Sequence, residues 1–190
     1  ATLLGGCIQS FQRKGQTYDT GFHYVGGLEE GQPLHTLFSY YDLMGLGWQK
    51  MDNLFDEVNI NGKSFFFAQG HQAFYQTLVE QFPHQKENLK QYLSLLKNVG
   101  DHIFDSLQPR NTEDFYSTSL FAQSAKEFLD ETITDPLLRD VLAGCSLKME
   151  LTPNLPLYTF AQINNSFVQS AWRLQGGGST LAKKLADSIQ

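Results

Sequence analysis

The chain of 190 residues is 41% hydrophobic and 13% aromatic, and its 14 Lys and Arg against 20 Asp and Glu give a formal net charge of −6 at pH 7. This composition is typical of a soluble globular protein with one sizeable core or two small ones, and it excludes an intrinsically disordered chain. The acidic balance argues against nucleic acid as the main partner, because phosphate binding needs a basic surface and no Lys/Arg cluster longer than a pair occurs.

The stretch from Gly5 to Gly27 contains paired glycines, a short apolar run, a basic turn, a strand-like segment and the triplet Asp19-Thr20-Gly21. This pattern predicts two loops around a β-hairpin. Glycine also tolerates positive φ and the close approach of other groups, so the same stretch fits a backbone that lies against a ligand. The residues alone leave both interpretations open.

The next two predicted elements have clear local signals. Pro33 suits the first turn of a helix, and apolar residues follow at near-helical spacing until the helix ends near Gly45 and Gly47. The pair Asn61-Gly62 then lies between two β-prone runs. This pair is the strongest short-range hairpin signal and predicts a hairpin over residues 55–68.

Most of the remaining chain is predicted to be helical. Gly100 is expected to weaken one amphipathic helix, and Asp135 with Pro136 fits the N-cap and first position of a later one. The predicted elements are helices over 70–82, 86–107, 122–132 and 135–148, a break over 152–156, an apolar segment over 157–174 and a last helix after Ser179. The expected fold class is α+β, mostly helical with a small antiparallel sheet.

The sequence offers no complete catalytic or metal-binding motif. Cys7 and Cys145 lie far apart and outside any CxxC, which favours reduced thiols and a cytoplasmic compartment over a disulfide or a zinc site. The five histidines have no partner at convincing ligand spacing, so no metal is predicted. No GxGxxG, GxxxxGK[ST] or GxSxG occurs, and no apolar run approaches the about 20 residues of a membrane-spanning helix.

Two other features each allow two interpretations. The loop Gly176-Gly177-Gly178-Ser179 could present N–H groups to an anion, or it could form a turn in which Ser179 is the N-cap. The aromatic side chains could line a pocket for a long apolar substrate, or they could form the core. These aromatic residues are Phe65, Phe66, Phe67, Phe115, Tyr116, Phe121, Tyr158, Phe160, Phe167 and Trp172.

Several segments, in this order, resemble FAD-dependent amine-oxidase-like enzymes, and most closely their phytoene desaturase, carotenoid isomerase and retinol saturase branch. The first is Gly5 to Phe11 with Lys14-Gly15 and Tyr18 to Gly27, which is similar to the segment after the first dinucleotide-binding unit of those enzymes. The later matches are Gly70, Phe82-Pro83 and Tyr92, and then Gly176 to Ser179 with Leu181 and Leu185. The resemblance covers nearly the whole chain.

The resemblance implies an FAD enzyme that moves hydride equivalents to or from a hydrophobic, polyene-like substrate. It implies remnants of a Rossmann-like FAD-binding domain over 1–30 and 173–190, and a substrate or lid region over 31–172. The implied cofactor-binding residues are Gly5, Gly6, Asp19, Thr20, Gly21, Gly177 and Gly178. No side chain stands out as a catalytic acid or base, so the catalytic residues are unknown.

The chain also departs from the family pattern. The glycine-rich GxGxxG turn, the ribose-binding acidic residue and the C-terminal flavin segment are absent, which predicts an internal fragment that does not hold FAD tightly by itself. The alternative is a non-catalytic helical module that binds an apolar ligand or a protein partner. The expected location is cytoplasmic, with peripheral membrane contact as an option that an apolar substrate favours, and the oligomeric state is unknown.

Overall fold

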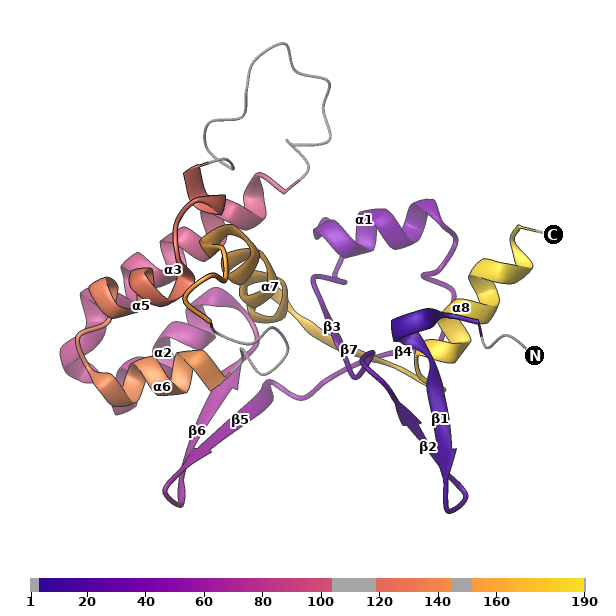
Figure 1. Ribbon diagram of the computed structural model, residues 1–190, viewed down its shortest axis with the longest axis horizontal. Helices are drawn as coiled ribbons and strands as arrows, with labels where there is room; N and C mark the ends of the chain where they lie inside the picture. The colour runs from indigo at the N-terminus through magenta and orange to yellow at the C-terminus, as the bar shows by residue number, and fades with distance from the viewer. Residues whose placement is uncertain (1–3, 104–118, 145–151, 190) are drawn as a thin grey trace, which may run out of the picture. The chain divides into compact units, whose positions relative to one another are not determined.

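The computed structural model describes residues 4–103, 119–144 and 152–189, which form two compact units. The first unit comprises residues up to 52 and from 170 onward, and the second comprises residues 53–169. The architecture is α+β with small antiparallel sheets (Figure 1), as the sequence predicts. The sequence instead divides the chain near residues 30 and 172. The cofactor-binding role of residues 1–30 and 173–190, and the substrate role of residues 31–172, stay predictions.

The first unit contains a hairpin and a three-stranded antiparallel sheet. Strands β1 and β2 pair with each other, and β7 lies between β3 and β4. The elements are η1 Gly6–Ile8, β1 Ser10–Arg13, β2 Gln16–Asp19, β3 Val25–Gly26, α1 Pro33–Tyr40, β4 Trp48–Lys50, β7 Ala171–Leu174 and α8 Gly178–Asp187. The hairpin turn has positive φ at Lys14 (51°) and Gly15 (74°), as a two-residue turn between twisted strands requires.

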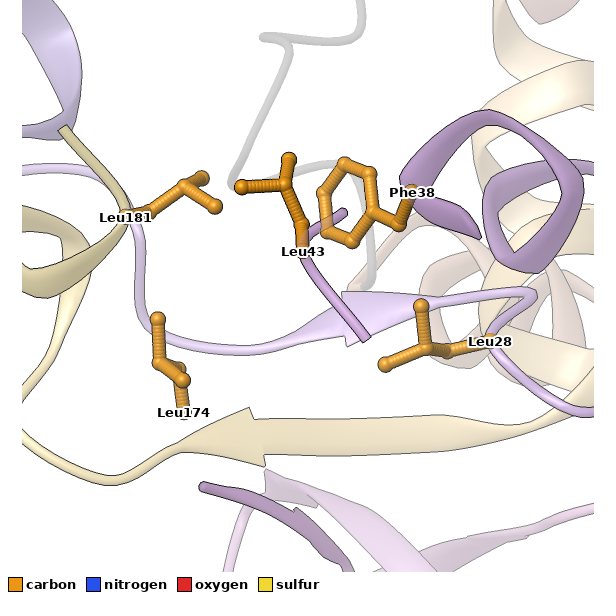
Figure 2. Packing of buried hydrophobic residues seen from close by; sticks show 5 residues of the cluster. All are labelled: Leu28, Phe38, Leu43, Leu174 and Leu181. Atoms are coloured by element: carbon orange, nitrogen blue, oxygen red, sulfur yellow. The ribbon is translucent and has the colours of Figure 1, made fainter. Parts of the chain in front are cut away.

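The core of the first unit joins segments from both ends of the chain. Figure 2 shows its buried side chains, which come from the β3–α1 connection, α1, the turn after it, β7 and α8: Leu28, Phe38, Leu43, Leu174 and Leu181. Helix α1 begins at Pro33 as predicted but ends at Tyr40, earlier than the predicted Gly45. It ends there because Asp42 adopts a φ of 54° and the N–H of Leu43 donates to the carbonyl of Phe38 at 2.8 Å, which turns Leu43 into the core.

The second unit combines a hairpin with helices. Its elements are β5 Leu54–Ile60, β6 Lys63–Ala68, α2 His71–Gln81, η2 Pro83–Gln85, α3 Lys86–Asp101, α5 Ala125–Thr132, α6 Pro136–Gly144 and α7 Leu157–Gln169. The predicted hairpin is confirmed, with Asn61 (φ 53°) and Gly62 (φ 79°) in its turn. Phe67 of β6 stacks on Phe74 of α2 with ring centroids 5.2 Å apart, which fixes this helix on the hairpin.

Local capping signals explain where the later helices begin. Asp135 accepts hydrogen bonds from the N–H groups of Leu137 and Leu138, so its predicted role as the cap of α6 is confirmed. Helix α5 begins at Ala125 rather than near 122, because Ser124 accepts from the N–H of Glu127. The predicted apolar segment over 157–174 divides into α7 and β7. Helix α3 ends at Asp101, with its C-cap at His102, so the end predicted at 107 is wrong. The end predicted at 148 lies outside the described residues.

Two further observations concern the cysteines and the helices. Cys7 is free and exposed, whereas Cys145 lies outside the described residues. Within the described part of the chain, none of the helices combines the length and the apolar character needed to cross a membrane.

Helices α3 and α7 pack closely around a glycine. Asn165 of α7 is 1% exposed, and its Oδ1 lies 2.7 Å from Nε2 of His71 in a hydrogen bond. A Cβ atom at Gly100 of α3 would lie 1.9 Å from Nδ2 of Asn165. Gly100 therefore leaves α3 intact up to Asp101 and provides the space that the buried amide occupies.

We predict that Gly100→Ala destabilises the protein by about 2 kcal/mol, the usual scale of overpacking. In an open helix the same change would add about 0.5–1 kcal/mol of stability, because alanine is the better helix former. Urea unfolding measures the difference, and Ser94→Ala on the exposed side of α3 is the matched control for helix propensity. A gain in stability for Gly100→Ala would contradict this packing.

Candidate functional site

Asp19 at the end of β2 joins the hairpin to the beginning of α8. Its Oδ1 accepts a hydrogen bond from the N–H of Gly178 at 2.9 Å and another from the hydroxyl of Ser10 at 2.8 Å. The carboxylate thus lies at the N-terminal end of α8, where a negative charge is favoured by the helix dipole. This contact joins residues 159 positions apart in the sequence.

Two serines complete the same junction. The N–H of Ser10 donates to the hydroxyl of Ser179 at 2.9 Å, and the N–H of Ser179 donates to the hydroxyl of Ser10 at 3.3 Å. The interpretation of Ser179 as the N-cap is wrong, since Gly177 occupies that position and Asp19 and Ser10 accept from the first N–H groups. Sequence reasoning missed Ser10, which carries no signal of its own.

Two glycines permit the close approach of these segments. A Cβ at Gly177 would lie 2.2 Å from Oδ1 of Asp19, and this residue also has a φ of 69°. A Cβ at Gly178 would lie 2.1 Å from the carbonyl oxygen of Ile8. Both positions therefore require glycine for packing within the chain. An external anion at the start of α8 would have to compete with Asp19 for the same N–H group.

The two glycines at the start of η1 differ from each other, because a side chain would clash at Gly5 but not at Gly6. Gly5 has a φ of 103°, and a Cβ there would lie 2.9 Å from Cβ of Ala182 in α8. Gly6 has a φ of 50°, and apart from its two chain neighbours no atom of the described residues lies within 4 Å of where its Cβ would be. Gly6 and Cys7 are both exposed. The backbone at Gly6 is thus accessible to a ligand that needs close approach.

The remaining predicted site residues hold η1 in place. The N–H of Thr20 donates to the carbonyl of Gln9 at 3.0 Å. A Cβ at Gly21 would lie 3.3 Å from the carbonyl oxygen of Cys7, so this position also favours a small residue. The structure thus brings Gly5, Gly6, Asp19, Thr20, Gly21, Gly177 and Gly178 into one junction of η1, β2 and α8. Their binding of a cofactor stays a prediction.

A cavity of about 320 Å³ lies beside this junction. Its lining includes Asp19, Gly177, Gln49 and Arg173, whose side chain is exposed and has no carboxylate partner among residues 4–103, 119–144 and 152–189. A cavity with a carboxylate, a guanidinium and amide groups suits a polar ligand group rather than a polyene chain.

An exposed ion pair further fixes α8. The ammonium group of Lys184 donates to Oδ2 of Asp42 at 2.6 Å, and this hydrogen bond together with the positive charge lowers the pKa of Asp42. Asp42 follows α1, so the pair holds the turn after α1 against α8. Because the carboxylate is exposed, the contribution of the pair to stability is small.

Half of the described members of the predicted aromatic set are buried in the core. Phe65, Phe67 and Phe160 are at most 1% exposed, and Phe65 stacks on Phe82 with centroids 5.6 Å apart. Phe121 is 51% exposed, and Phe115 and Tyr116 lie outside the described residues. The buried members of this set favour the core interpretation over a pocket within the second unit.

The comparison with known proteins identifies a family. Residues 3–190 match the model of the flavin-containing amine oxidoreductases. The chain is also similar to all-trans-retinol 13,14-reductases: 26% identical to that of Homo sapiens over 100% of this chain, 24% to that of Danio rerio over 98% and 25% to that of Rattus norvegicus over 100%. Each match covers 34% of the relative, so the chain spans about a third of the length of these curated relatives. The predicted superfamily and its retinol saturase branch are confirmed.

We predict that Asp19→Ala lowers stability by about 1–2 kcal/mol, because the first N–H of α8 and the hydroxyl of Ser10 both lose their acceptor. Asp19→Asn keeps an amide oxygen in the same place and should recover most of this loss. Asp187→Ala, which removes an exposed carboxylate at the other end of α8, is the control and should not destabilise. Equal unfolding midpoints for Asp19→Ala and the parent would refute the cap.

Proposed function

The chain belongs to the flavin-containing amine oxidoreductase family, and on this basis we propose that it is part of an FAD-dependent oxidoreductase acting on a hydrophobic, polyene-like substrate. The all-trans-retinol 13,14-reductases to which it is similar act, by their name, on one double bond of such a molecule. The observation that carries the proposal is the open glycine turn at Gly6, held by the Asp19 junction in a chain of this family.

The glycines of the junction differ in how accessible they are to a flavin cofactor. Gly6 presents exposed backbone with free space around it, which suits the close approach of a cofactor phosphate or ribose. Gly5, Gly177 and Gly178 instead contact other parts of the chain. In our proposal Gly6 approaches the cofactor, and the other three glycines keep the turn in position.

We propose separate roles for the flavin and for the residues of the chain. When bound, the flavin supplies the hydride chemistry, and the chain contributes binding and orientation. Asp19 and Ser10 hold β2 and α8 together, so that η1 has a fixed place beside them. The segment 1–30 together with 173–190 is proposed as part of the flavin-binding domain, and 31–172 as the substrate region.

The alternative function, a non-catalytic module for an apolar ligand, has no specific support. The aromatic side chains that would form such a pocket include Phe65, Phe67 and Phe160, which are buried in the core of the second unit. A cavity of about 280 Å³ between α5 and α6 has Lys126, Asp130 and Arg139 in its lining. These charged groups do not suit an apolar ligand.

We predict that Gly6→Ala weakens FAD binding, whereas Gly31→Ala does not. Gly31 is the matched control, since it also has a positive φ (81°) and, among the residues that the structure describes, no atom beyond its chain neighbours within 4 Å of its Cβ position. Both changes should therefore cost about 1 kcal/mol of backbone strain, and only Gly6→Ala should obstruct a ligand. Flavin fluorescence titration of the protein as its gene encodes it measures the affinity. Equal affinities for the two variants would exclude Gly6 from the site.

The substrate class is tested by a separate experiment. We expect the protein as its gene encodes it, supplied with FAD and a reductant, to convert all-trans-retinol into a product with one double bond fewer. Chromatography with ultraviolet detection follows the shortened conjugation. Conversion that proceeds equally without the protein, or bound flavin that reoxidises with no change in retinol, would refute the proposed substrate class.

A further inference from the structure

The three-stranded sheet of the first unit has a polar face. Along β4 and β7 successive side chains point to opposite sides. The register pairs Trp48 with Leu174, which is buried in the core, and Gln49 with Arg173. Gln49 and Arg173 therefore lie on the face that points away from the core, and both residues are exposed.

The cavity of about 320 Å³ collects polar side chains from this face and from the hairpin. Thr17 and Asp19 alternate with Tyr18 in β2, so their side chains lie on the same side of the strand, and both line the cavity. Gln49, Arg173 and Gln175 also line it. All of these residues belong to the first unit. The cavity thus contains one anionic and one cationic side chain together with neutral polar groups.

One carboxylate oxygen of Asp19 can accept a hydrogen bond from a ligand. Its Oδ1 already accepts from the hydroxyl of Ser10 and from the N–H of Gly178, and these two bonds fix the orientation of the carboxylate. Among the residues that the structure describes, no group donates to Oδ2. This oxygen is therefore suited to a ligand that brings an ammonium or a hydroxyl group.

Arg173 is the complementary group. In the described part of the chain its guanidinium group forms no ion pair, neither with Asp19, which lines the same cavity, nor with another carboxylate. A guanidinium group binds a carboxylate through two parallel N–H···O bonds. The side-chain amide of Gln49, its partner across the sheet, can donate to the same carboxylate.

We propose that this cavity binds a small polar molecule that carries a carboxylate at one end and a hydrogen-bond donor, an ammonium or a hydroxyl group, at the other. The carboxylate contacts Arg173 and Gln49, and the donor contacts Oδ2 of Asp19. The volume of about 320 Å³ is at the lower end of the range for small-molecule sites, so it suits a molecule of a few carbon atoms.

Other ligand classes fit this cavity less well. A simple anion is repelled by Asp19, and a simple cation is repelled by Arg173. An apolar chain would remove water from both charged groups without replacing their hydrogen bonds. The polyene-like substrate of the proposed function is therefore not the occupant, and the inference goes beyond that function.

The test is isothermal titration calorimetry of the protein, as its gene encodes it, with probes that share a chain of four carbon atoms: 4-aminobutyrate, 4-hydroxybutyrate, butyrate and butylamine. We expect 4-aminobutyrate or 4-hydroxybutyrate to bind at least about 10-fold more tightly than butyrate and butylamine, because each of the latter satisfies only one end of the site. Shorter and longer probes, 3-aminopropanoate and 6-aminohexanoate, then measure the span between the two ends.

Two variants separate the two ends of the site. Arg173→Gln should lower the affinity for every carboxylate probe, including butyrate, about 10-fold. Arg13→Gln is the matched control and should bind as the parent does, because Arg13 is also exposed and is also paired with a glutamine, Gln16, across two strands. Asp19→Asn places an amide N–H₂ group where Oδ2 was, so it should weaken binding of 4-aminobutyrate and 4-hydroxybutyrate but not of butyrate.

Three outcomes would overturn the proposal. The first is that no probe of any length binds. The second is that butyrate binds as tightly as the probes with a donor group, and the third is that Arg173→Gln and Arg13→Gln bind the probes equally. Flavin titration of the same variants keeps the two proposals apart. A loss of FAD affinity in Arg173→Gln with unchanged probe binding would assign the cavity to the flavin and also overturn this inference, whereas Gly6→Ala should weaken FAD binding alone.

Discussion

The hydrogen bond from the N–H of Gly178 to Asp19 is the contact on which the first unit depends. It joins the hairpin near the beginning of the chain to the last helix, and the core of Leu28, Phe38 and Leu181 is buried between segments that this contact brings together. A carboxylate at a helix N-terminus is favoured by the unpaired N–H groups and by the helix dipole. The absence of a side chain at Gly177 and Gly178 lets the segments approach closely enough for that bond.

The same constraint separates two roles that glycine has in this chain. At Gly5, Gly177 and Gly178 the space of a side chain is occupied by other parts of the protein, so glycine serves internal packing. At Gly6 no other described residue occupies that space, so glycine there leaves the backbone accessible. The glycines of this chain that resemble the family's motifs therefore have two roles: some hold the site in position, and Gly6 can face a ligand.

Sequence reasoning succeeded where the determinants are local and failed where they are not. Asn61-Gly62 forces a turn by its own backbone preference, and Asp135 caps the helix that begins at the next residue, so both were predictable. The end of α1 at Tyr40 depends on the packing of Leu43 against core residues that are distant in the sequence. The local sequence around Tyr40 therefore does not predict where the helix ends. The seven site residues could be named by resemblance. Their contacts with Ser10, Ile8 and Ala182 could not, because these contacts span up to 177 positions, from Gly5 to Ala182.

The second unit shows how burial limits the recognition of a long apolar substrate. Its hairpin and helices are held together by stacked phenyl rings such as Phe67 on Phe74, and α3 approaches α7 closely because Gly100 makes room for the buried Asn165. Protein interiors are close-packed, so a polyene could enter this core only by displacing side chains, which would lower the stability of the protein. If the proposed substrate class is right, the walls of its site must include surfaces other than this core.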